Sequence, residues 1–163
     1  MLPTLFLPPQ RPLLPEEWRH GIQALEAAMR ALPGHVEGSG DHCPLTHRFA
    51  DGIYVREMFL AKGTMLTGRI HRFTHPTFLM AGKLLVISEF DGRQVVAAPA
   101  LWIAPQGTKR ALYALEHSRL VTVHATATTD VDALEEELTC VDYEQLGAGS
   151  HHADAAGEFE SLS

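Results

Sequence analysis

The chain has 163 residues, of which 45% are hydrophobic and 20% charged, a composition that predicts one packed domain with appendages. All 13 lysine and arginine residues lie before residue 130, and no basic stripe interleaved with aromatic residues is present, which excludes a nucleic-acid binder. No apolar run approaches the roughly 18 residues of a membrane span, and Cys43 and Cys140 match no disulfide or zinc motif, so a reducing, cytoplasmic compartment is expected.

The N-terminal third is expected to hold an extended arm, a helix and a loop. Residues 1–14 are rich in proline, which removes backbone donors and favours an extended arm. A helix is predicted for residues 15–33, because Pro15 suits a first turn and apolar residues follow at spacings of three and four. Residues 34–44 contain the glycine, histidine and proline of a connecting loop.

The middle of the chain, residues 45–128, predicts an antiparallel β-barrel. Short β-branched or aromatic runs alternate there with turn residues such as Asp91-Gly92. The expected strands are residues 53–60, 65–71, 77–80, 84–90, 94–98 and 120–127. Several short strands at close spacing are typical of a barrel or sandwich.

The C-terminal part changes its pattern again. Within residues 129–146, Thr129 or Asp130 can cap a short acidic helix whose apolar stripe contains Val131, Leu134 and Leu138. Residues 147–163 are small, polar and acidic, and we expect them to form a flexible tail. The neighbouring His151 and His152 in this tail are expected to be inert or adventitious metal binders.

Two histidines four residues apart, His71 and His75, form the most informative pair. On one continuous strand they would lie about 13 Å apart, at roughly 3.3 Å per residue. That separation is too large for one metal ion with bonds of about 2.1 Å, so the chain must turn between them if both are ligands. A hairpin meets that need, since Pro76 favours an extended conformation at His75. A helical pair is the other solution, but the surrounding composition is not helical.

This region resembles the cupin superfamily, whose first motif contains a glycine, an HxH pair, a glutamate and a second glycine. Counted back from Gly82, His75 takes the glutamate position, His71 the second histidine and Arg69 the first. The second motif, PxGxxH, resembles residues 105–110, with Arg110 in place of the third histidine. The resemblance covers about half of the chain. It implies a mainly β cupin barrel, or jelly roll, but the usual set of three histidines and a carboxylate is not carried over whole.

A narrower resemblance is to small cupin-like proteins common in phage genomes. It rests on the pattern around His47, Tyr54 and Glu57, on the paired histidines, on the Pro-x-Gly-x-x-Arg element, and on a late histidine, His124. It implies no established activity, but it adds the virion to the expected locations and other phage or virion proteins to the expected partners.

His124 is the first candidate for a third metal ligand. A polar barrel interior would collect it together with Thr122 and Thr126 on one side of the last strand, and with Thr67 and Arg69 on the side of His71. The opposite orientation, with the neighbouring valines inward and His124 in water, is equally simple.

Further site residues are weaker candidates. Glu57 could supply a carboxylate ligand and His47 a fourth imidazole. Arg69 and Arg110 could bind an anion or a substrate, because a guanidinium suits carboxylate and phosphate groups. The simpler role for Arg110 is an ion pair with Glu57 or Glu89.

Two functions of different classes remain. The first is a metal-dependent protein acting on a small molecule, in which the histidines hold a divalent transition metal such as Fe, Zn, Mn or Ni. The second is a non-catalytic binding or assembly module. A homo-oligomer is expected in either case, since a second copy can close exposed strand edges.

Overall fold

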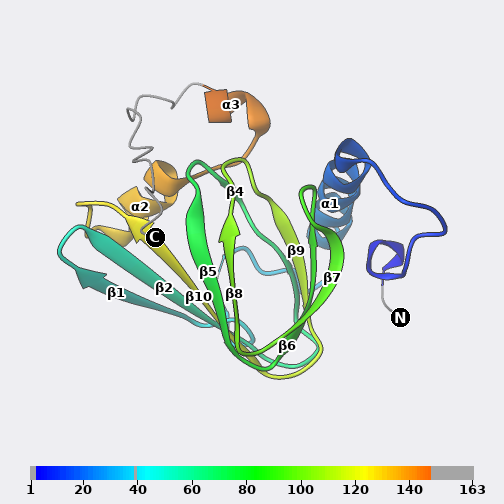
Figure 1. Ribbon diagram of the computed structural model, residues 1–163, viewed down its shortest axis with the longest axis horizontal. Helices are drawn as coiled ribbons and strands as arrows, with labels where there is room; N and C mark the ends of the chain where they lie inside the picture. Colours follow the sequence, from blue (N-terminus) through cyan, green and yellow to red (C-terminus); the bar gives the residue numbers. More distant parts are fainter. Residues whose placement is uncertain (1–2, 39, 148–163) are drawn as a thin grey trace, which may run out of the picture.

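The computed structural model describes residues 3–38 and 40–147, which form a two-sheet barrel. The first sheet is antiparallel and has the strand order β1-β2-β10-β5-β8, and the second has the order β3-β9-β6-β7. Each sheet contains neighbours that are far apart in sequence, as in β10 beside β2 and β9 beside β3. This arrangement of two facing sheets is a mainly β, cupin-type jelly roll, which confirms the predicted fold class (Figure 1).

The strands follow the short apolar runs of the sequence. Those of the first sheet are β1 (Leu45–Ala50), β2 (Ile53–Leu60), β5 (His75–Ala81), β8 (Ala100–Ala104) and β10 (Ser118–Ala125). Those of the second are β3 (Met65–Thr67), β6 (Lys83–Ser88), β7 (Gly92–Ala97) and β9 (Arg110–Ala114). A separate two-stranded ribbon joins β4 (Ile70–His71) to β11 (Thr139–Cys140).

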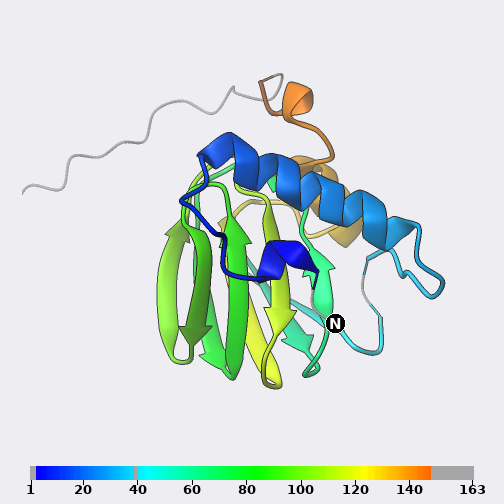
Figure 2. The same ribbon diagram turned by 90° about the vertical axis from the view of Figure 1, so that its right-hand side faces the viewer.

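Helix α1 (Pro15–Arg30) covers the outer face of the second sheet (Figure 2). Trp18, Ile22 and Leu25 on its apolar stripe are buried against Leu85 and Ile87 of β6. Glu16 and Glu17 lie in the first turn, where the helix dipole favours negative charge. The helix ends three residues earlier than the sequence pattern predicts.

The N-terminal arm does not project from the molecule. A 3-10 helix, η1 (Thr4–Phe6), lies beside α1 (Figure 2). Its Phe6 side chain is buried in the same core cluster as Trp18 and Ile22 of α1. The guanidinium of Arg93 donates to the carbonyl oxygen of Phe6 at 2.9 Å. This part of the arm therefore packs with α1 against the second sheet.

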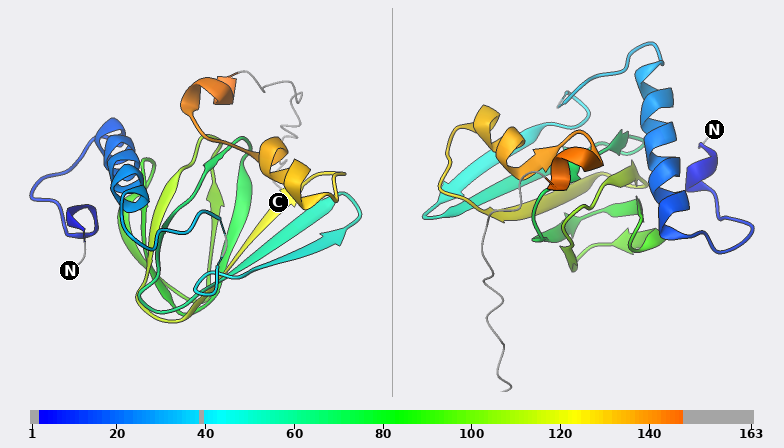
Figure 3. Two further views of the ribbon diagram at one scale, coloured as in Figure 1. Left: turned by 180° about the vertical axis from the view of Figure 1, so that it is seen from behind. Right: turned by 90° about the horizontal axis from the view of Figure 1, so that it is seen from above.

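The C-terminal elements lie across one end of the barrel (Figure 3). They are α2 (Val131–Leu138), the strand β11 and α3 (Tyr143–Gly147). The Asp130 side chain accepts from the amide of Asp132, as expected of a capping residue. Leu134 and Leu138 of α2 pack on Tyr54 of β2, so α2 closes this end of the barrel next to the first sheet.

Several strand predictions differ from the structure. β1, β8 and β9 were not predicted. β8 and β9 are five-residue strands that flank the loop-like segment with Pro105 and Gly107, and β1 follows directly after the predicted loop 34–44. The predicted strand 65–71 is interrupted at residues 68–69, where Gly68 bonds to the backbone of Arg110. The tail beyond Gly147, with His151 and His152, lies outside the described residues. Among the helices that the structure describes, none is both long and apolar enough to cross a membrane.

Candidate functional site

A turn of three residues brings His71 and His75 together. His71 is the last residue of β4 and His75 is the first of β5, so the chain turns between them as predicted. The two strands do not form the predicted hairpin, because β4 pairs with β11 whereas β5 pairs with β10 and β8. The two imidazole ring centroids lie 4.2 Å apart. The chain therefore reverses within three residues and directs both side chains to one point.

His124 of β10 completes the cluster. Its ring centroid lies 4.5 Å from that of His75 and 5.7 Å from that of His71. One nitrogen from each of the three rings lies within 4.8 Å of the others. His75 and His124 are buried, and His71 is partly exposed. The alternative orientation, with His124 in water, is wrong.

Strand register explains why His124 points inward. His124 pairs with Tyr54 of β2, and Thr122 pairs with Thr77 of β5. Directly paired residues of antiparallel strands share a face, and residues two apart on one strand do as well. The interior-facing row therefore includes Tyr54, Thr77, Thr122 and His124.

Hydrogen bonds leave ring nitrogens of the cluster available. Nδ1 of His75 lies 3.1 Å from the carbonyl oxygen of Phe73, which can only accept, so Nδ1 carries the proton. Nε2 of His75 then holds a lone pair, and it is buried without a hydrogen-bond partner, as is Nδ1 of His71. A carbonyl that fixes a histidine tautomer in this way is typical of metal-ligating histidines.

Burial keeps the three imidazoles neutral. It lowers the pKa of His124 to about 3, with smaller contributions from the charges of His75 and Arg56. Burial likewise lowers the pKa of His75 and, well below its usual value, that of His71. Neutral imidazole is the form that binds metal ions, so these side chains are ready to act as ligands at neutral pH.

Aromatic side chains support the cluster from one side. The ring of Tyr54 stacks on His124 with centroids 6.0 Å apart. The Tyr54 hydroxyl lies 2.7 Å from Nδ1 of His47. His47 therefore lies behind Tyr54, and the structure does not place it with the three clustered histidines.

Arg110 projects into the barrel from the opposite sheet. Its guanidinium carbon lies 5.4 Å from the ring centroid of Trp102, an interior-facing residue of β8. Arg56 of β2, paired in register with Thr122, also faces the interior. The charges of both arginines lower the pKa values of His71 and His75, although burial is the larger cause. The cluster thus lies between two cationic side chains.

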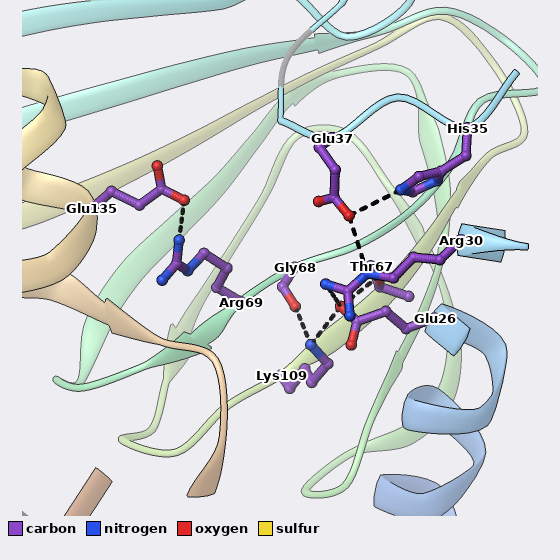
Figure 4. A network of polar contacts seen from close by, with 9 residues as sticks. All are labelled: Glu26, Arg30, His35, Glu37, Thr67, Gly68, Arg69, Lys109 and Glu135. Carbon is purple, nitrogen blue, oxygen red and sulfur yellow. Dashed lines mark hydrogen bonds and ion pairs between the residues drawn. The ribbon is translucent and has the colours of Figure 1, made fainter. Parts of the chain in front are cut away.

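The other candidate residues lie elsewhere. Glu57 follows Arg56 on β2 and so faces outward, where its carboxylate accepts from Arg48 and Arg119. Arg69 pairs with Glu135 of α2 outside the barrel (Figure 4). The structure brings neither residue to the histidines.

Two threonines of the expected polar interior point away from it. The hydroxyl of Thr67 donates to Glu26 of α1 (Figure 4). Thr126 bonds to Glu137 of α2. Of the threonines considered in the sequence, Thr122 is the one beside the cluster, with its hydroxyl 3.1 Å from Nε2 of His124.

Arg56, Trp102 and Thr77 belong to the site but were not predicted. Period-two alternation on β2 puts Arg56 on the face of Tyr54 and opposite to Glu57. That signal was present in the sequence, but it required knowing which face of β2 is interior. No comparable signal marked Trp102, because β8 itself was not predicted.

The fold and the cluster together define a cupin-type jelly roll with three histidines gathered at one end, an arrangement consistent with a metal site. The chain is similar in fold to several solved structures. KdgF from Halomonas sp. is 13% identical, with 56% of this chain and 87% of that chain covered and a TM-score of 0.48. An RmlC-like cupin from Shewanella frigidimarina is 18% identical, with 58% and 85% covered and a TM-score of 0.47. A cupin superfamily protein from Desulfitobacterium hafniense is 11% identical, with 74% and 95% covered and a TM-score of 0.46.

No family model matches the sequence, and no curated protein matches it. At the identities of the three structures, the similarity concerns the fold and not an activity. The comparisons do not support the association with phage proteins.

Proposed function

We propose that the protein binds one divalent transition metal ion through His71, His75 and His124. The observation that carries this proposal is the convergence of three neutral imidazoles whose inward nitrogens include buried atoms without a hydrogen-bond partner. An unpaired buried nitrogen costs free energy. A metal ion that accepts the lone pairs removes that cost.

The ligand set favours Fe, Zn, Mn or Ni over calcium or magnesium, since imidazole suits the former and oxygen the latter. When bound, such an ion supplies a Lewis acid with coordination positions that the three histidines do not fill. The carbonyl of Phe73 holds the tautomer of His75, and Tyr54 holds the ring of His124. A metal-dependent reaction on a small molecule is the activity we infer from this arrangement.

Elemental analysis of purified protein tests the site. Because His151 and His152 could bind metal adventitiously, the measurement uses a parent in which both are alanine. About one equivalent of metal is expected in the parent, and a loss of at least tenfold in occupancy in His75→Ala or His124→Ala. The exposed His20 serves as the control, and His20→Ala should retain the metal. Equal metal content in all four proteins, or none in the parent, contradicts the proposal.

A second candidate function, self-association or assembly, is favoured by the outer face of the first sheet. Leu101 and Ile103 on β8 are 60% and 59% exposed, and Met80 on β5 is 53% exposed. Phe78 pairs directly with Leu101, so these side chains form one apolar strip. Apolar surface of this kind is typical of protein interfaces.

A second copy of the chain is the partner we propose for this strip. Light scattering across a concentration series should show a dimer or larger assembly that dissociates in Leu101→Glu. The control is Val36→Glu, at an exposed apolar residue in the loop after α1. A monomer at every concentration rejects self-association. Virion or phage partners are a separate proposal, which rests on the sequence resemblance alone.

A further inference from the structure

Arg110 is a buried cation without a counterion. The residue is only 8% exposed, and its Nε and Nη2 atoms are buried without a hydrogen-bond partner. Its contact with the face of Trp102 is a cation-π interaction and leaves the in-plane donors unused. Burial lowers the pKa of Arg110 to about 10, so the side chain is still charged at neutral pH.

Arg56, on the first sheet, is a second arginine with a buried nitrogen that has no hydrogen-bond partner. It is partly buried, and its Nε is also buried and unpartnered. Among the residues that the structure describes, no carboxylate lies within ion-pair distance of either arginine. Asp91 attracts Arg110 electrostatically and raises its pKa, but its carboxylate bonds to Ser88.

The other arginines in the same part of the molecule are paired. Arg69 binds Glu135, Arg119 and Arg48 bind Glu57, and Arg19 binds Glu89 at 2.5 Å. Glu57 and Glu89, the carboxylates first considered as partners of Arg110, therefore pair with other arginines. Within residues 3–38 and 40–147, none of these ion-paired carboxylates contacts Arg110 or Arg56.

An unpaired buried charge is strongly unfavourable for stability, because its desolvation is not offset by an attraction. Two such charges face one interior beside neutral histidines, whose pKa values both charges lower. A divalent cation at the histidines would add further positive charge to the same space. A negatively charged group would compensate the positive charges of Arg110 and Arg56.

We infer that the barrel interior binds a small molecule through an oxyanion group, a carboxylate or a phosphate, held by Arg110 and Arg56 beside the histidine cluster. A guanidinium offers paired donors that match either group. The hydroxyl of Thr77, buried without a partner on the same interior face, supplies a further polar contact. Placing the anion next to a metal rests on the proposed function, whereas the pairing with arginine does not.

Titration calorimetry with malonate and with inorganic phosphate tests the inference and separates the two chemistries. Malonamide, which has the shape of malonate but no charge, is the ligand control. Each titration is run on metal-stripped and on metal-loaded protein, with metal content measured on the same samples. We expect one of the two anions to bind and malonamide not to bind.

Arg110→Met and Arg56→Gln are the test variants, and Arg69→Gln is the matched control at an arginine paired outside the barrel. Losing a charge-assisted contact should weaken anion binding by about tenfold or more, and Arg69→Gln should leave it unchanged. Without anion, Arg110→Met should also raise the Tm, because it removes an uncompensated buried charge. A purely structural arginine would instead lower the Tm on replacement.

The outcomes distinguish the two proposals. Anion binding that survives both arginine replacements overturns the inference, as does wild-type protein that binds neither anion with metal present. In both cases the metal content still reports on the histidine site independently. If the protein takes up no metal at the histidines but binds an anion through Arg110, the metal proposal is overturned and the anion site is supported.

Discussion

The rings of His71 and His75 lie with their centroids 4.2 Å apart although the two residues are four positions apart in sequence. Two imidazolium ions at this separation would repel each other in a buried site, with Arg56 and Arg110 adding to the repulsion. The metal-free cluster therefore favours the neutral form of each imidazole and disfavours its protonation. This preference has a consequence for the stability of the fold.

The metal-free protein should lose stability as the pH falls below about 6.5. Burial lowers the pKa of His124 to about 3. Between about pH 6.5 and pH 3, His124 is therefore protonated in the unfolded chain but neutral in the folded protein. Stability is thus full above the unfolded pKa and declines towards the folded one. At pH 5 the loss due to His124 alone is about 2 kcal/mol.

Urea unfolding at pH 7 and pH 5, in the presence of a chelator, measures this loss. His124→Gln should reduce the difference between the two pH values, whereas His20→Gln, at an exposed helical position, should preserve it. Glu17 does not affect this comparison. The hydrogen bond with Arg11 lowers the pKa of Glu17 to about 2, so its contribution to stability is lost only at a pH below the range from 7 to 5. Equal stability at pH 7 and pH 5 would contradict the prediction.

The ion pair between Lys109 and Glu26 should hold α1 to the barrel. Nζ of Lys109 lies 2.9 Å from Glu26 and 2.8 Å from the carbonyl oxygen of Gly68 (Figure 4). Lys109 is only 4% exposed. Glu26→Ala leaves this charge buried with one neutral acceptor and should cost about 3–5 kcal/mol of unfolding free energy.

The double variant Glu26→Gln with Lys109→Met removes both charges and should recover most of that loss. Glu16→Ala, at an exposed position in the first turn of the same helix, is the control and should cost less than about 1 kcal/mol. Chemical denaturation measures all three variants. A double variant no more stable than Glu26→Ala would show that the charge is not the cause.

Gly82, in the turn between β5 and β6, should not tolerate a side chain. Its φ angle is +82°, and an added Cβ would overlap the carbonyl oxygen of His117 and lie 2.7 Å from Cα of Ser118. Gly82→Ala should therefore destabilise the protein by about 3 kcal/mol or more. Gly52 has a similar φ of +71° with open space around it, so Gly52→Ala should cost only about 1–2 kcal/mol.

Thermal unfolding of the two alanine variants separates strain in the backbone from overlap with a neighbour. The measured difference between them is the contribution of the contact with His117 and Ser118. Equal losses in both variants would mean that the turn can shift to admit a Cβ.

Phe6 should contribute to stability as a core residue. It is 1% exposed, and its ring lies 5.9 Å from that of Tyr113. Phe6→Ala should cost about 3–5 kcal/mol. Leu7→Ala, at the next residue, which is 49% exposed, should cost less than about 1 kcal/mol. If Phe6→Ala unfolds at the same denaturant concentration as wild type, the arm is not part of the core.

The local elements were readable from the sequence because their signals are local. Pro15 and the apolar spacing after it predicted α1, and a capping residue at Thr129 or Asp130 predicted α2. The turn between His71 and His75 followed from chain length once both were taken as ligands, since an extended segment would separate them too far for a shared ion. The short strands indicated an antiparallel barrel or sandwich, and the resemblance to cupins narrowed this to a jelly roll.

The tertiary structure decided which side of each strand faces the interior. Period two fixes that Arg56 and Glu57 lie on opposite faces of β2, but not which of them is inside; pairing with β10 puts Arg56 there. The same choice buries His124 and leaves the neighbouring valines on the other face of β10. The ion-pair partners of the arginines also depend on the tertiary structure. Arg69 contacts Glu135 only because α2 packs over the end of the barrel. Arg110 forms no ion pair with any carboxylate among the described residues. A sequence records the charges of these side chains, whereas their surroundings depend on strands that are paired across long distances in the chain.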